Sequence, residues 1–214
     1  MDQAEQMLAH EAGHAVLAIV HDLPLTLADS IDGFCEFGEP ARLLRGFAWL
    51  EVNVAGTAAE RCCGYQGAEL NTIDYHAALR AALDVSDPTH PRALEAMADL
   101  ENQHYLIHAE TFYAAFGPSV ERAVVDAGPV FAVVCDMLVR YGRCPAEQLA
   151  AAVEIDPAAR YSLTMARSAA RKRAAAAKVL PPHLARESEA LALAANKKEC
   201  AERVAAIRRA RGLG

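Results

Sequence analysis

Apolar side chains recur at helical spacing near the start of the chain, over residues 4–21. The segment contains no proline, and the spacing of its larger apolar residues is typical of a helix with 3.6 residues per turn. These residues are Met7, Leu8, Val16, Leu17 and Val20. The pattern predicts a helix that ends near Asp22-Leu23-Pro24.

Glycine and proline interrupt the helical pattern over residues 24–46. Two short runs of apolar or β-branched character remain, at residues 25–27 and 34–37. Runs of this length allow at most a small two-stranded sheet, that is, one β-hairpin. Helical periodicity returns over residues 48–63 and predicts a second helix.

Asn71 and Thr72 follow a glycine-containing break and offer side chains that cap a helix N-terminus. We therefore expect a third helix from this point to about residue 85. Asp74 would lie in its first turn, where the helix dipole favours a negative charge.

The second half of the chain is helical in pattern almost throughout. Long periodic segments cover residues 92–116 and 119–141, and Gly117-Pro118 predicts a break between them. Cys144-Pro145 is expected to begin a shorter helix that ends near residue 153.

The composition favours helices over sheets. Hydrophobic residues make up 53% of the chain with much alanine, whereas aromatic residues make up 6%. Alanine is the best helix former, and strands are enriched in aromatic and β-branched residues. We predict a mainly α fold with at most a small β-hairpin.

Charge divides the chain into two parts. Residues 1–156 hold 24 acidic and 8 basic side chains, for a charge of −16, and residues 157–214 hold 4 and 13, for +9. We expect a folded domain over 1–156 and a basic tail over 157–214, the tail forming two alanine-rich helices separated by Pro181-Pro182. Charge complementarity favours docking of the tail on an acidic body, its own or that of another subunit. Tyr161 is the tail's one aromatic residue, which makes nucleic-acid stacking an unfavoured role.

Cysteine usage and the N-terminal sequence favour the cytoplasm. The six cysteines form no C-x-x-C pair, and a chain of 214 residues needs no disulfide framework. The first residues carry acidic groups where a signal peptide carries basic ones, and no apolar run approaches the roughly 20 residues that span a bilayer. We expect a soluble cytoplasmic protein without a membrane partner.

The segment His10-Glu11-Ala12-Gly13-His14 matches the pattern H-E-x-x-H. Two histidines four residues apart project from one face of a helix, where they can share a metal ion. Imidazole nitrogens suit zinc, and a catalytic zinc takes three protein ligands and keeps one position for water. A chance match in a chain of this length has a probability on the order of 1%. We therefore predict that His10 and His14 bind zinc.

Glu11 lies between the two histidines in sequence and points toward the water rather than the metal. It is predicted to act as the general base, which takes a proton as water attacks a carbonyl and returns it to the leaving amine. The reaction expected from this trio is the hydrolysis of peptide bonds.

Three segments resemble the peptidase domain of the FtsH family, which comprises membrane-anchored, ATP-dependent zinc peptidases. Residues 10–16 resemble the zinc-site helix, residues 55–60 look like the family's G-G-R-x-A-E helix, and residues 71–74 lie about where the family has its S-N-D-L segment. Similarity extends weakly to about residue 153 and does not cover the tail. The resemblance implies a helical, zincin-like peptidase domain.

The same resemblance implies that Asp74 is the third zinc ligand. It also implies that Glu60 orients a histidine, although Glu60 could equally be a solvated helix charge. Ile73 departs from the family pattern just before the aspartate. Other side chains therefore compete for the third position: Glu60, Glu69, His76 and His104.

The sequence contains no G-x-x-x-x-G-K-[ST] phosphate loop and no membrane helix before the peptidase region. The expected substrates are therefore flexible peptide segments, or unfolded chains if a separate ATPase partner supplies them. The protein is also expected to assemble into a homo-oligomer. One alternative is a regulator or binding module that keeps the metal on a peptidase fold without proteolysis. Another is a zinc peptidase of a different lineage, such as one that cleaves a repressor.

Overall fold

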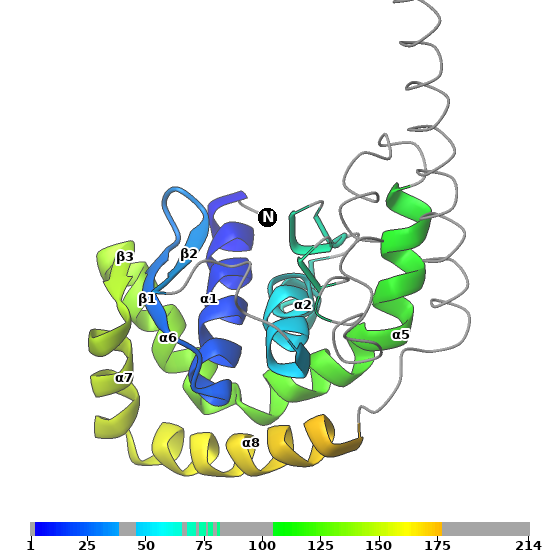
Figure 1. Ribbon diagram of the computed structural model, residues 1–214. Helices are drawn as coiled ribbons and strands as arrows, with labels where there is room; N and C mark the ends of the chain where they lie inside the picture. The colour runs from blue at the N-terminus through cyan, green and yellow to red at the C-terminus, as the bar shows by residue number, and fades with distance from the viewer. Residues whose placement is uncertain are drawn as a thin grey trace, which may run out of the picture.

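The computed structural model describes residues 3–38, 46–65, 68–71, 73–75, 77–78, 81 and 105–176. Within them the chain is mainly helical with a small antiparallel sheet, which confirms the predicted fold class (Figure 1). The elements in chain order are α1 (Gln3–His21), β1 (Leu25–Asp29), β2 (Phe34–Phe37), α2 (Gly46–Cys62), α5 (Tyr105–Asp126), α6 (Gly128–Tyr141), β3 (Arg143–Pro145), α7 (Ala146–Ile155) and α8 (Pro157–Ala176).

Helices α1 and α2 lie side by side at the centre of the molecule (Figure 1). They approach closely because small residues line the contact. A Cβ atom placed on Gly13 would stand 2.4 Å from the backbone oxygen of Ala55 and 2.7 Å from Cβ of Ala59. No side chain fits that space, so glycine at position 13 sets the distance between the two helices.

The sheet has three strands in the order β2-β1-β3, all antiparallel. The sheet therefore has one strand more than the two-stranded hairpin expected from the sequence. Strand β3 has three residues and pairs with a strand from a distant part of the chain, so the local sequence pattern does not predict it. It is fixed by Arg143, whose Nε lies 2.5 Å from Oδ2 of the buried Asp29 on β1.

Helix α5 runs without a break through Gly117 and Pro118, so the predicted interruption there is wrong. Side-chain contacts within the helix bridge the proline. Gly117 packs directly on the ring of Tyr113, and the Tyr113 hydroxyl donates a hydrogen bond of 2.9 Å to Glu121, one turn beyond the proline. The helix ends instead at Asp126, before α6. Residues 92–104 of the predicted helix lie outside the described residues.

Helix α8 opens the basic tail and packs along the body, beneath α6, α1 and α5 in Figure 1. Its buried face consists of small residues and one leucine, and two of its arginines contact acidic or carbonyl groups of the body. Arg173 binds the buried Glu51 of α2, and Arg167 donates to the backbone oxygen of Ile19 at 3.1 Å. The predicted Pro181-Pro182 boundary lies outside the described residues. Among the described helices, none combines the length and apolarity needed to cross a membrane.

Candidate metal centre

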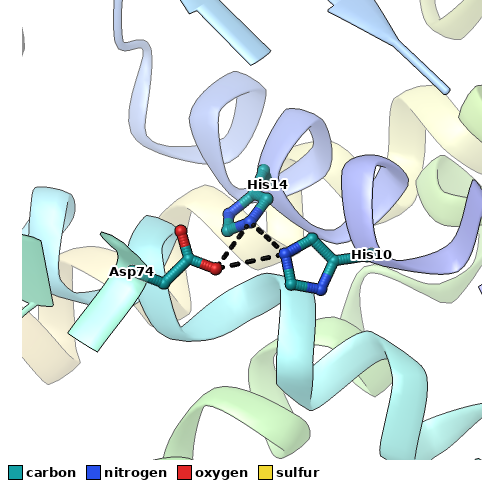
Figure 2. Close-up of side chains that lie close together, drawn as sticks. All are labelled: His10, His14 and Asp74. Carbon is teal, nitrogen blue, oxygen red and sulfur yellow. Dashed lines mark hydrogen bonds and ion pairs between the residues drawn. The ribbon is translucent and has the colours of Figure 1, made fainter. Parts of the chain in front are cut away.

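His10, His14 and Asp74 meet in one cluster, to which α1 contributes the two histidines (Figure 2). The histidines stand one turn apart on the same face of α1, as their spacing predicts. Their Nε2 atoms are 3.0 Å apart, and Oδ2 of Asp74 lies 3.1 Å from Nε2 of His10 and 3.3 Å from Nε2 of His14. The sequence thus correctly predicted which three side chains come together.

A backbone carbonyl fixes the orientation of His14. Its Nδ1 lies 2.7 Å from the oxygen of Val52 in α2. A carbonyl oxygen only accepts hydrogen bonds, so Nδ1 carries the proton and donates it. The Nε2 atom of a neutral His14 therefore presents a lone pair toward the cluster.

Glu60 fixes the orientation of His10 in the same way. Nδ1 of His10 lies 2.9 Å from Oε1 of Glu60, which stands on α2 and is nearly buried. This carboxylate accepts a hydrogen bond from Nδ1–H, so the Nε2 atom of a neutral His10 presents its lone pair toward Asp74. Of the two readings of Glu60 from sequence, the geometry supports the one in which it orients a histidine.

Asn71 holds Asp74 in place. Its Oδ1 accepts a hydrogen bond of 2.9 Å from the backbone N–H of Asp74, which is the N-terminal cap expected from the sequence. Its Nδ2 donates to Oδ2 of Asp74 at 2.7 Å. Asn71 thereby holds both the backbone and the carboxylate of Asp74, which is 8% exposed.

The donor atoms of the cluster fit a zinc ion. Both Nε2 atoms and Oδ2 of Asp74 are electron-pair donors, and three such atoms at 3.0–3.3 Å repel one another unless a cation or a proton lies between them. Ligands at 2.0–2.1 Å around a tetrahedral zinc lie roughly 3.3–3.4 Å apart. The observed spacing of 3.0–3.3 Å is slightly shorter than that, so a small outward movement of the three donors would accommodate the ion.

The close approach of these side chains also shifts their pKa values in the metal-free site. Burial alone would lower the pKa of His10, but the carboxylates of Asp74 and Glu60 outweigh it and raise the pKa to about 10. Burial likewise opposes ionisation of Asp74, yet the two histidines hold its pKa well below the usual range. The site therefore attracts one positive charge, as a proton or as a metal ion.

Glu11 lies beside the cluster and is 3% exposed. Its Oε2 is buried and has no hydrogen-bond partner among the described residues. Burial raises the pKa of Glu11, although His14 and His10 act in the opposite direction. An unpaired buried carboxylate oxygen is costly, and such groups are common at sites that bind a water or a ligand.

These side chains open into a cavity of about 520 Å³. Its walls come from α1, the strand β2, one face of α2 and the helical turn that bears Asp74. The residues lining it include His10, Glu11, His14, Phe34, Cys35, Phe37, Trp49, Val52, Asn53, Asn71, Ile73 and Asp74. The cluster is thus accessible from outside.

The remaining candidates for the third position do not join the cluster where they are described. Glu60 binds the far side of the His10 ring, and the side chain of Glu69 is exposed. His76 and His104 lie outside the described residues. Among the described residues, His10, His14 and Asp74 form the one group spaced to share a metal.

Sequence reasoning missed two contributions of α2 to this site. The Val52 carbonyl is a backbone group with no sequence signal. Asn53 lines the cavity, and a signal for it was present: Trp49, Asn53 and Gly56 recur at the spacing of one helical face.

Comparison of the chain with protein-family models, with curated proteins and with solved structures gave no match.

Proposed function

We propose that this protein is a zinc-dependent hydrolase, and within that class a metallopeptidase of the FtsH type. One observation supports the proposal above the others: His10, His14 and Asp74 converge with their donor atoms 3.0–3.3 Å apart, beside the unpaired carboxylate of Glu11. An aspartate as third donor is what the FtsH resemblance implies.

The three clustered side chains would hold the ion through Nε2 of His10, Nε2 of His14 and Oδ2 of Asp74. Zinc at this position would supply Lewis acidity, which lowers the pKa of water and polarises a substrate carbonyl. Val52, Glu60 and Asn71 keep the three donors oriented.

Glu11 is the proton carrier in this proposal. Its raised pKa makes the carboxylate a stronger base than a solvated glutamate, and Oε2 has no competing partner among the described residues. It takes a proton from the attacking water and gives it to the leaving amine. Burial excludes bulk water from this exchange.

The cavity favours internal peptide bonds of flexible segments. Its walls are largely apolar, with Phe34, Phe37, Trp49 and Ile73 on them, and no lysine or arginine lines it within the described part of the chain. A carboxypeptidase needs a cation to bind the terminal carboxylate. The 520 Å³ volume accommodates a few residues of extended chain rather than a folded domain.

The alternative is a metal-binding module without hydrolytic activity. Such a module has no use for a buried, unpartnered glutamate beside its metal ligands, because that group destabilises the fold. The presence of Glu11 therefore favours the enzyme.

The test is cleavage of an unstructured, casein-like protein by the zinc-loaded full chain, with Glu11→Gln as the comparison. The amide keeps the size of Glu11 but cannot accept a proton, so we expect equal zinc content and a loss of cleavage of at least about a hundredfold. Equal cleavage by both proteins would refute the role of Glu11. Zinc-loaded wild-type protein that cleaves no unstructured chain would favour the binding module.

A further inference from the structure

Asn53 is a buried polar residue that the proposed hydrolysis does not use. It stands on α2, is 6% exposed, and lines the cavity together with Glu11 and His14. Trp49 and Gly56 lie on the same helical face, one turn before and one turn after it.

The hydrogen bonds of Asn53 determine which way its amide points. Nδ2 donates to the backbone oxygen of Trp49 at 2.6 Å, and a carbonyl oxygen can only accept, so the nitrogen must occupy that side. Oδ1 is then the free end of the amide. No hydrogen bond to Oδ1 is found among the described residues, and Oδ1 is not one of their fully buried unpaired atoms, so it meets the cavity. A ligand N–H that reaches this acceptor would gain a hydrogen bond against a largely apolar wall.

The other polar groups of the cavity do not provide that donor. Glu11 and Asp74 are acceptors, the histidine Nε2 atoms face the metal position, and Asn71 is occupied with Asp74. A ligand that carries N–H donors would therefore match the hydrogen-bond acceptors of this cavity. An extended polypeptide presents one N–H every residue, with alternate ones on the same side.

We propose that Asn53 is a substrate-binding residue whose Oδ1 accepts a hydrogen bond from one backbone N–H of an extended peptide lying across His10, Glu11 and His14. The inference rests on the proposed function, because it takes a peptide as the ligand. Phe37 and Trp49 meet edge to face beside Asn53, with ring centroids 5.0 Å apart. This apolar surround excludes water and strengthens the hydrogen bond.

The experiment measures binding of fluorescent peptides to the zinc-loaded full chain in which Glu11→Gln prevents turnover. One peptide of flexible, apolar-rich sequence is compared with a series in which each backbone N–H in turn is replaced by an ester oxygen. One ester should weaken binding about tenfold, and the others much less, since only that ester loses the hydrogen bond to Oδ1 of Asn53. Asn53→Leu, which has a similar volume and no acceptor, should abolish the difference between that ester and the parent peptide.

A scan in which no single ester weakens binding by more than about twofold would overturn the proposal without any change to Asn53. An ester that is equally harmful with Asn53→Leu would overturn it as well. Val54→Ala is the matched control: Val54 is buried in the same helix but does not line the cavity, so the ester effect should remain.

The two proposals can fail separately. Position-specific binding by a wild-type protein that cleaves nothing would support the role of Asn53 and refute hydrolysis. Cleavage of unstructured chains, together with peptide binding that no single ester weakens, would support hydrolysis and refute the role of Asn53.

Discussion

Gly56 of α2 lies directly against the imidazole ring of His14 on α1. A Cβ atom at Gly56 would stand 2.6 Å from Nε2 of His14, and also 2.6 Å from Nε2 of His10. Helix α2 thus forms the floor of the candidate metal centre. The absence of a side chain at position 56 is what allows both nitrogens to reach the same point.

Gly56→Ala should weaken zinc binding while the helices remain folded. The added methyl group occupies the space of the two Nε2 atoms, so at least one ring must turn away from Asp74. We expect the affinity for zinc to fall roughly tenfold or more, measured by competition with a chromophoric chelator. Gly128→Ala is the control, because a Cβ there meets nothing within 4 Å. Zinc affinity unchanged in Gly56→Ala would show that the metal does not lie at these nitrogens.

Asp74→Asn should reduce the amount of zinc that stays with the protein. The amide keeps the size of the carboxylate but removes the charge that binds a cation, so zinc content should fall from about one per chain to a small fraction after dialysis. Glu69→Gln removes an exposed acidic group near the same turn and should change nothing. Elemental analysis of both variants makes the comparison. Full zinc retention by Asp74→Asn would assign the third position to another residue.

Zinc binding should release about one proton near neutral pH. In the metal-free site, Asp74 and Glu60 raise the pKa of His10 to about 10 against the effect of burial, so an extra proton is bound throughout the neutral range. Zinc displaces it, and the apparent affinity should rise about tenfold per pH unit between pH 6 and 9. Calorimetry in two buffers of different ionisation enthalpy counts the protons. A titration that releases none would contradict the raised pKa.

The parts of the site that were foreseen from sequence depend on local geometry. The two histidines share a face because four residues make about one helical turn, and Asp74 is held by Asn71, three residues away. Both relationships survive any arrangement of the remaining helices. This is why a short motif and a capping signal sufficed to place them.

The parts that were missed depend on contacts between distant segments. The Val52 carbonyl reaches His14 only because α2 packs on α1 with one rotation about its axis. Strand β3 exists because residue 143 returns to pair with β1. Local propensity carries no information about these pairings.

The buried Glu51 should make the docking of α8 sensitive to acid. Glu51 is fully buried, accepts hydrogen bonds of 2.6 and 2.9 Å from Arg173 of α8, and lies 2.6 Å from Nε2 of His21. Burial by itself would raise the pKa of Glu51, but Arg173 and His21 outweigh it and hold the pKa below the usual 4.5. A carboxyl with a lowered pKa stabilises the fold above the unfolded-state pKa. That contribution is lost as the pH falls below 4.5 and passes through the folded-state pKa.

Arg173→Met should therefore lower the free energy of unfolding by about 3 kcal/mol at pH 7, because it leaves a buried charge without its main partner. The difference from wild type should narrow as the pH falls below 4.5, since protonation of Glu51 removes the same interaction from the wild-type protein. Arg171→Met removes an exposed arginine from the same helix and should change stability little at any pH. Urea unfolding of the three proteins from pH 7 to pH 3 gives the comparison. A difference that stays constant over this range would show that Glu51 does not couple α8 to the body through its charge.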